Sequence, residues 1–231
     1  MAEHPERHHR QIRSFVRRAG RLTASQERAL EELWPGYGVE YAPGALDFET
    51  LFGRSAPVVL EIGFGNGDTL VEMAAARPDQ DFLGIEVHEP GVGHCLIKAD
   101  KAGVSNLKLV VHDAIEVLEN QVASGSLSRI NLYFPDPWPK KRHHKRRLIQ
   151  PAFVELLVSR LAAGGRLHLA TDWEDYAQQM LAVLEAQVGL ENLTGPGRFA
   201  GRPASRPLTK FEARGRRLGH RRVHRHQPRR R

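Results

Sequence analysis

The chain has 231 residues, of which 41% are hydrophobic, so it can form one domain with a substantial core and is too apolar for a disordered protein. No apolar run approaches the roughly 20 residues that a membrane-spanning helix requires, and the polar N-terminus lacks the apolar stretch of a secretory signal. Cys95 is the single cysteine, which excludes an intramolecular disulfide and a cysteine-based zinc cluster and fits a reducing cytoplasm. We expect Cys95 to be buried and unreactive.

The net charge of +7 is unevenly distributed along the chain. Residues 1–22 hold six Arg and two Glu, residues 140–147 hold six Lys or Arg and no acid, and residues 198–231 hold thirteen Lys or Arg and one Glu. The rest of the chain is therefore net acidic. Cations clustered on an acidic body are typical of a protein that binds a polyanion, and the alternative is a surface that is merely well solvated. A membrane partner is not expected, because no amphipathic helix accompanies the charge.

In chain order, residues 1–22 are expected to form a flexible basic arm, and Thr23 is placed to cap a helix that ends near Pro35. After a linker at 35–56, apolar runs alternate with helical patterns. The expected strands cover residues 58–62, 82–87, 107–111, 129–134 and 165–171. The expected helices cover residues 69–77, 93–102, 114–122, 148–161 and 173–187. This alternation predicts a doubly wound α/β domain with a mostly parallel sheet. The end of the chain, 220–231, is predicted to be a disordered basic tail.

A glycine-rich turn follows the first expected strand. Gly63, Gly65 and Gly67 stand at alternate positions, which allows a tight turn and the close approach of a ligand. The spacing differs from the dinucleotide fingerprint, because Asp68 stands where that fingerprint has its third glycine. Glu61 and Asp68 would repel a pyrophosphate and suit a cationic ligand. The turn therefore favours S-adenosyl-L-methionine over a nicotinamide dinucleotide, with a purely structural turn as the alternative.

Carboxylates follow four further expected strands. Glu86 ends the second strand, where a carboxylate can accept from both ribose hydroxyls, and Asp113 follows the third, level with an adenine. Asp136 and Asp172 follow the fourth and fifth, and a carboxylate there can accept from N1–H and the 2-amino group of guanine. Helix capping is the alternative for Asp113 and Asp172. Trp138 and Trp173 could stack on a base, and burial in the core is the alternative.

A cationic run follows Asp136 directly. Lys140 begins it, and the residues expected to contact RNA are Arg142, His143, His144, Lys145, Arg146 and Arg147. The histidines stand among cations, which favours RNA contact over metal binding, and no metal-ligand spacing is present.

Six segments together resemble one known family, the tRNA (guanine-N7)-methyltransferases of the bacterial single-chain type. They are IRSFVRRAGRLTASQ, VVLEIGFGNGDTL, FLGIEVHEPGVGHCL, NLYFPDPWPKKRHHKRRL, LATDWEDYA and RPLTKFEARGRRLG. The resemblance runs from about Ile12 to about Gly219. It implies a Rossmann-like methyltransferase domain over 23–219, with the seven-stranded type of sheet found in class I S-adenosylmethionine-dependent enzymes. The implied reaction makes 7-methylguanosine at position 46, in the variable loop of tRNA, in the cytoplasm.

The resemblance also implies roles for individual residues. Those implied to line the cofactor site are Glu61, Glu86, Asp113 and Asp136. Asp136 is implied to be catalytic as well. The residues implied to bind the substrate guanosine are Lys140, Asp172, Thr209, Lys210, Phe211 and Glu212. Residues 142–147 match the segment that contacts RNA.

The sequence departs from the family after Gly219, where members continue with a short apolar strand and this chain continues with HRRVHRHQPRRR. Either the last strand is lost or an RNA-binding extension replaces it. Three other functions remain open at this point: an adenine amino methyltransferase, a non-catalytic RNA-binding module and a nicotinamide-dependent oxidoreductase. The first would carry a second proline after Asp136-Pro137, where this chain has Trp138. No obligate protein partner is evident.

Overall fold

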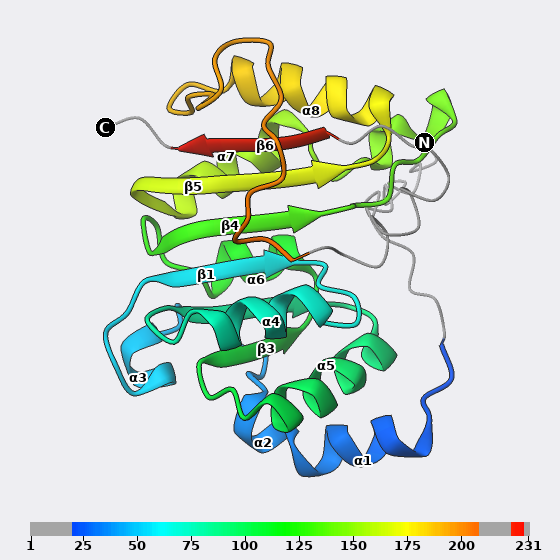
Figure 1. Ribbon diagram of the computed structural model, residues 1–231, viewed down its shortest axis with the longest axis vertical. Coiled ribbons are helices and arrows are strands. Elements are labelled where there is room, and N and C mark those ends of the chain that lie inside the picture. The colour runs from blue at the N-terminus through cyan, green and yellow to red at the C-terminus, as the bar shows by residue number, and fades with distance from the viewer. Residues whose placement is uncertain (1–19, 208–222, 229–231) are drawn as a thin grey trace, which may run out of the picture.

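The sheet at the centre of the molecule orders its strands β3-β2-β1-β4-β5-β6 (Figure 1). The computed structural model describes residues 20–207 and the backbone of 223–228, so the expectations for 1–19 and 208–222 lie outside the described residues. The strands are β1 (Val58–Ile62), β2 (Asp81–Glu86), β3 (Leu107–Val111), β4 (Leu127–Tyr133), β5 (Leu161–Thr171) and β6 (Val223–Pro228). The first five are parallel and β6 is antiparallel to β5. The predicted doubly wound α/β architecture is confirmed.

Helices cover both faces of this sheet. They are α1 (Ala24–Glu32), α2 (Trp34–Tyr37), α3 (Phe48–Phe52), α4 (Asp68–Ala76), α5 (Glu89–Ala102), α6 (Ala114–Asn120), α7 (Pro151–Arg160) and α8 (Glu174–Ala186), with a 3₁₀ helix η1 at Lys141–Arg146. The core cluster on one face includes residues of α6, α7 and α8, and the cluster on the other includes residues of α1, α4 and α5. In the part of the chain that the structure describes, no helix is long and apolar enough to cross a membrane.

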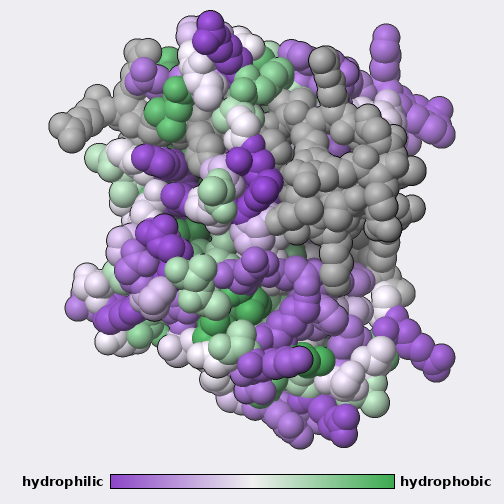
Figure 2. Space-filling view, in the orientation of Figure 1, coloured by the Kyte–Doolittle hydropathy of each residue, from purple (hydrophilic) through white to green (hydrophobic). Residues whose placement is uncertain are grey.

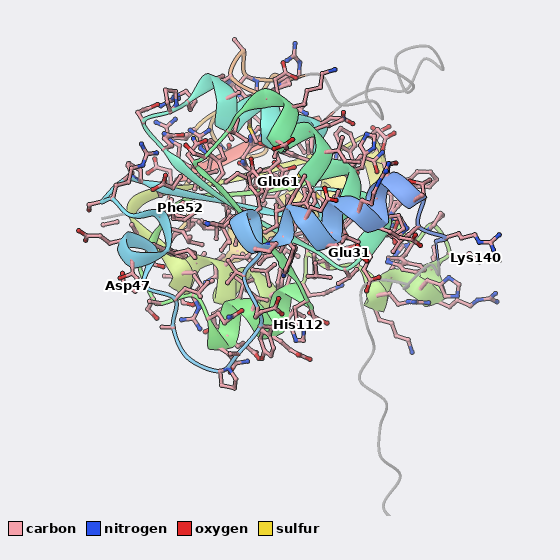
Figure 3. All side chains as sticks on the ribbon, turned by 90° about the horizontal axis from the view of Figure 1, so that it is seen from below. Glu31, Asp47, Phe52, Glu61, His112 and Lys140 are labelled. Atoms are coloured by element: carbon pink, nitrogen blue, oxygen red, sulfur yellow. The ribbon has the colours of Figure 1, made fainter. Side chains whose placement is uncertain are left out.

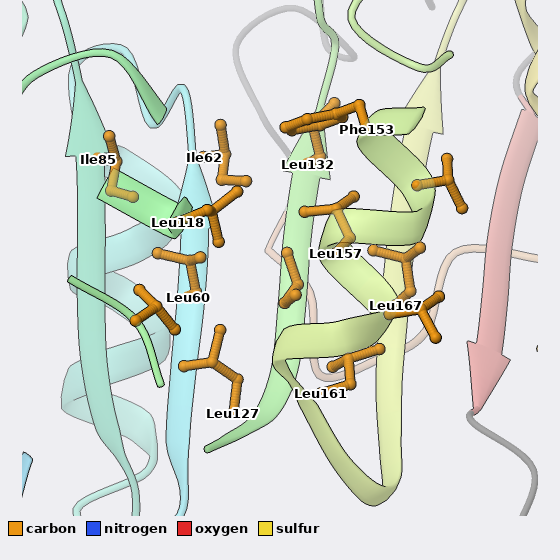
Figure 4. Close-up of a cluster of buried hydrophobic side chains, with 14 of the residues drawn as sticks. Leu60, Ile62, Ile85, Leu118, Leu127, Leu132, Phe153, Leu157, Leu161 and Leu167 are labelled. Atoms are coloured by element: carbon orange, nitrogen blue, oxygen red, sulfur yellow. The ribbon is translucent and has the colours of Figure 1, made fainter. Parts of the chain in front are cut away.

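The central strands are aliphatic on both faces because both faces are covered. All five residues of β1 are buried, and alternate side chains serve opposite cores. Leu60 and Leu118 of α6 belong to the core shown in Figure 4, whereas Val59 packs in the cluster with Leu70 of α4. Complete burial of one leucine contributes about 2 kcal/mol, so these two clusters supply the main driving force for the fold.

Several helix boundaries differ from the prediction. Thr23 caps α1 as predicted, in a reciprocal capping box with Gln26. By contrast, α5 begins at Glu89, four residues before its predicted start, because Pro90 fits the first turn of a helix. The segment at 141–146, for which the sequence predicts neither a helix nor a strand, forms η1. Its run of cations has no apolar periodicity from which a helix could be predicted.

The C-terminal tail corrects one prediction. Within the tail predicted to be disordered, 220–231, residues 223–228 form β6 and pair with β5 from Thr171↔Val223 to Arg166↔Pro228. Strand pairing satisfies the backbone donors and acceptors that the edge of β5 would otherwise leave open, and it does not need apolar side chains. The described residues therefore contain a last edge strand and six strands in all, so the seven-strand count is not confirmed.

Candidate active site

Two adjoining cavities open where the parallel strands end. The first has a volume of about 380 Å³ and the second about 400 Å³. Both are lined by Gly63, His88, Tyr133 and Phe134, which makes them neighbours. Glu86, Asp113 and Asp136 also line the first, and Glu61 and Asp68 also line the second. The structure thus brings together the predicted cofactor carboxylates from β1, β2, β3 and β4, at the edge of the sheet where open α/β folds bind ligands.

The glycine-rich turn forms the floor between these cavities. Gly65 has a φ of +57°, and a Cβ atom there would meet nothing within 4 Å, so its backbone faces open space. At Gly67, with a φ of +72°, a Cβ atom would lie 2.3 Å from the sulfur of Cys95. Gly67 therefore serves the packing of α4 on α5, and its contact with the cofactor stays a prediction. Cys95 is buried, as predicted, and burial raises the pKa of its thiol.

The carboxylate of Glu86 is held by backbone N–H groups. It accepts hydrogen bonds from Gly65 (2.8 Å), Val87 (2.7 Å) and His88 (3.1 Å). A carboxylate has about four acceptor positions, so capacity for a ligand remains. The bond from Gly65 ties the end of β2 to the glycine-rich turn. Glu86 therefore shapes the turn and at the same time faces the first cavity.

Glu61 is buried, with 3% of its surface exposed. Its Oε2 has no hydrogen-bond partner among the described residues. The pKa of this carboxyl is raised to about 8, mainly by burial; the charge of Arg206 opposes the rise, and Glu86 makes a smaller contribution to it. Figure 3 shows Glu61 in the interior of the domain. A buried carboxyl beside a cavity, with one oxygen that no described residue hydrogen-bonds, fits a cationic group such as the ammonium of S-adenosyl-L-methionine.

Two further acids have local roles as well. Asp113 caps α6, accepting from the N–H of Ile115 at 2.9 Å, which confirms the capping interpretation. It also lines the first cavity, where its contact with the cofactor stays a prediction. Asp68 forms an ion pair with Lys98 of α5, which compensates the charge predicted to favour a cationic ligand. The preference for a cation therefore depends on Glu61.

Asp136 lies in a short loop after β4. It is exposed and lines the first cavity. Phe134 and Trp138, on either side, have φ angles of +53° and +45°, which are unfavourable for bulky residues. Strained backbone of this kind persists only where surrounding contacts hold it, and it is common in active sites.

The other predicted substrate residues lie at the margin. Asp172 follows β5, half-buried, and does not cap α8, whose N-cap is Trp173. Lys140 is exposed and projects from the domain (Figure 3). Neither lines the two cavities. Thr209, Lys210, Phe211 and Glu212 lie outside the described residues.

The cationic run divides into exposed and buried side chains. Arg142 and Lys145 are exposed, and the guanidinium of Arg146 lies 3.8 Å from the ring centroid of Trp138. His143 and His144 are half-buried; burial and the neighbouring cations lower the pKa of His143. The side chain of Arg147, also predicted to contact RNA, is only 1% exposed. On the face seen in Figure 2, hydrophilic residues are spread over the described surface with small hydrophobic areas between them.

Arg206 is a site residue that sequence reasoning missed. The segment after α8 crosses β5 and β4 (Figure 1), and it buries Arg206 to 1% exposure. The guanidinium lies 5.1 Å from the ring centroid of Tyr133 and 5.9 Å from that of Phe134. In the sequence this arginine is one of many in the basic C-terminal segment, and no local pattern separates it from them.

Comparisons with known proteins identify the family. The model of a family described as "Putative methyltransferase" matches residues 55–224. A tRNA (guanine-N(7)-)-methyltransferase of Aeromonas hydrophila is 61% identical over 211 residues, covering 91% of this chain and 89% of that protein. The protein of the same name from Halorhodospira halophila is 58% identical over 212 residues, covering 91% of this chain and 92% of its own length. The chain belongs to the tRNA (guanine-N7)-methyltransferase family.

Solved structures with the same fold include distant methyltransferases. A 16S rRNA methyltransferase, KamB, superposes with a TM-score of 0.54 at 14% identity, covering 81% of this chain and 95% of that chain. The aminoglycoside resistance methyltransferase NpmB1 gives a TM-score of 0.52 at 14% identity, covering 82% and 95%. At this identity the likeness concerns the fold alone, which is the predicted Rossmann-like fold of class I methyltransferases. As a member of the tRNA (guanine-N7)-methyltransferase family, the protein is an enzyme whose methyl donor is S-adenosyl-L-methionine.

Proposed function

We propose that this protein transfers the methyl group of S-adenosyl-L-methionine to N7 of a guanine in tRNA, at position 46 of the variable loop. The observation that carries the proposal is the convergence of Glu61, Glu86, Asp113 and Asp136 on two adjoining cavities. A protein that only bound RNA would gain nothing from acids at four strand ends. The cytoplasm, where tRNA is found, is the proposed location.

Three of these acids suit the parts of the methyl donor. The buried carboxyl of Glu61, whose Oε2 has no hydrogen-bond partner among the described residues, would bind the ammonium group, because pairing with a cation reduces the penalty of ionising it. Glu86 has acceptor capacity left for the ribose hydroxyls, and the second oxygen of Asp113 is available near the adenine. The methyl donor supplies a methyl group on a positively charged sulfur.

The methyl acceptor needs no base to activate it. N7 of guanine has an in-plane lone pair and carries no proton, so the rate depends on holding this lone pair in line with the bond that breaks. Orientation of this kind can supply roughly 7 to 11 kcal/mol. Positive charge appears on the guanine ring as the methyl group moves. The carboxylate of Asp136, at the rim of the first cavity, would stabilise this charge and hold the base.

The basic segments would hold the tRNA. Exposed cations of η1, among them Arg142 and Lys145, lie on the chain directly after the Asp136 loop and suit phosphate contacts. Lys140, Asp172 and residues 209–212 are proposed to complete the guanosine pocket. If the base leaves a stacked loop to enter the cavity, unstacking costs a few kcal/mol, and the backbone contacts offset this cost.

Methylation of unmodified tRNA by the purified protein, with a methyl-labelled donor, tests the function. The expected product is 7-methylguanosine at position 46. Recovery of N6-methyladenosine would instead favour an amino methyltransferase, and failure to bind the donor in calorimetry would favour a non-catalytic RNA-binding protein.

The role of Asp136 has its own test. Asp136→Ala is expected to lower the single-turnover rate by at least ~100-fold, as loss of an electrostatic catalytic group does, while the tRNA dissociation constant changes by less than about twofold. A matched control is Asp79→Ala, which removes a surface acid paired with Arg77 and should keep wild-type turnover. Undiminished turnover in Asp136→Ala would remove this residue from the mechanism.

A further inference from the structure

The side chain of Arg147 is fully engaged inside the protein. Its Nε donates to the carbonyl oxygen of Pro137 at 2.8 Å, Nη1 to Oε1 of Gln179 at 2.6 Å, and Nη2 to Oδ2 of Asp175 at 2.5 Å. Its guanidinium lies 4.8 Å from the ring centroid of Tyr176. Only 1% of the side chain is exposed. Three acceptors and an aromatic face thus fix one geometry of the planar guanidinium.

This burial separates Arg147 from the cations beside it. A phosphate contact by Arg147 would require all three hydrogen bonds to break and would leave the acceptors that remain buried without donors, at about 1–3 kcal/mol each. Arg142 and Lys145 are exposed and could reach a phosphate without such a cost. Position in the cationic run therefore does not make Arg147 an RNA contact.

The bond to Pro137 reaches the loop that carries Asp136. β4 ends at Tyr133, and the N–H of Phe134 still donates to the carbonyl of Ala170 in β5 at 2.8 Å. Two residues of the loop, Phe134 and Trp138, have positive φ angles. Pro135 and Pro137 have no N–H group, so they cannot donate to an anchor. The carbonyl of Pro137 is an acceptor next to Asp136, and Arg147 occupies it.

The other two bonds lead to α8, which is part of the rigid core. Tyr176 is completely buried, and its hydroxyl accepts from the N–H of Ile149 at 3.1 Å. Gln179 donates to the carbonyl of Ile149 at 3.2 Å. The hydrogen bond from Arg147 also lowers the pKa of Asp175, which keeps this carboxylate ionised. Arg147 therefore joins the strained loop to a helix that cannot shift easily.

We propose that Arg147 is a positioning residue, which holds the Pro137 carbonyl and thereby sets Asp136 at the rim of the first cavity. The inference rests on the proposed role of Asp136. Arg147 acts through its geometry and not through its charge. The branched guanidinium reaches all three acceptors at once, whereas the single ammonium group of a lysine cannot.

Arg147→Lys tests this directly because it keeps the charge and loses the branched geometry. We expect the methylation rate at saturating tRNA to fall ~10- to 100-fold, the loss that a misplacement of about 1 Å can cause. The tRNA dissociation constant and its dependence on salt should stay within about twofold of wild type. If Arg147 instead contacted a phosphate, Arg147→Lys would change the tRNA dissociation constant or its salt dependence and keep the methylation rate. That result would overturn the proposal.

Two further variants separate positioning from stability. Gln179 lies on α8, outside the cationic run, and Gln179→Met removes one acceptor of Arg147. This variant should lower the methylation rate at saturating tRNA without changing tRNA affinity. Arg160→Lys is the matched control, because Arg160 donates to the carbonyl of Leu118 and the hydroxyl of Ser124 at 2.8 Å each, remote from the cavities. It should lower the melting temperature and keep the rate. An equal loss of rate in Arg160→Lys, or no loss in Gln179→Met, would refute the positioning role.

The wild-type protein in the same assay separates a failure of the proposed function from a failure of the positioning role of Arg147. If it makes no 7-methylguanosine, the proposed function fails. If it does, and Arg147→Lys matches its rate, only the positioning role of Arg147 fails. If Arg147→Lys does not fold, the outcome with Gln179→Met decides.

Discussion

Two glutamates on neighbouring strands show how local surroundings set the chemistry of one side-chain type. Glu86 ends β2 and accepts three backbone hydrogen bonds, which fix the position of its carboxyl group. Glu61, one strand away, is buried, and its Oε2 finds no partner among the described residues. The same carboxyl group is therefore held by three backbone donors in one position, and is buried with a raised pKa in the other.

The raised pKa of Glu61 predicts how stability depends on pH. Between its usual value of 4.5 and its folded value of about 8, the folded protein holds a proton that the unfolded chain has lost. Stability of the ligand-free protein should therefore fall as the pH rises through this range. Glu61→Gln removes this dependence, so its melting temperature relative to wild type should rise between about pH 5 and about pH 9. Thermal melts that stay parallel across this range would contradict the assigned pKa.

At the scale of elements, the glycine-rich turn owes part of its composition to helix packing. Gly67 is the N-cap of α4, in the left-handed conformation, and Cys95 of α5 occupies the space where its side chain would be. At Gly91 of α5, an added Cβ atom would lie 2.4 Å from the carbonyl oxygen of Gly65. The turn, α4 and α5 are thus fitted to one another, and the same turn contributes Gly63 to the lining of both cavities.

This fit predicts unequal costs for two similar substitutions. Gly103→Ala, at the left-handed C-cap of α5, would place its Cβ in open space and should cost only the backbone strain, about 1–2 kcal/mol. Gly67→Ala has the same strain and must also displace Cys95, which adds about 1–3 kcal/mol. Urea denaturation of both variants measures the difference. Equal costs would show that α5 moves away freely.

At the scale of the whole molecule, the basic tail contributes an edge strand and positive charge, and the charge is proposed to serve tRNA binding. Residues 220–231 hold six arginines, and residues 223–228 pair along the edge of β5. A strand at this edge covers backbone groups that would otherwise invite pairing with another chain. The same residues add positive charge that can attract a polynucleotide.

Two variants separate these roles. Deletion of 220–231 should lower the melting temperature, because β5 loses its partner, and should weaken tRNA binding more at low salt than at high salt. A second variant keeps 223–228 and replaces the five arginines that flank β6 with glutamine. This variant should bind tRNA more weakly and with less salt dependence than wild type, and it should keep the wild-type melting temperature. A deletion variant that melts like wild type would mean that β6 contributes no stability.

Local patterns in the sequence predicted most of the fold and the core of the candidate site. The β1 and β3 ranges, the cap at Thr23 and the positions of Glu61, Glu86 and Asp113 depend on neighbours in the chain and on the rule that parallel strands end at one edge of a sheet. What depended on tertiary structure was the environment of single residues. Arg147 and Arg206 look like any other cation in a basic run, and only contacts with residues far away in the chain bury them. β6 formed because β5 offered an edge, a condition that no local pattern in the tail contains.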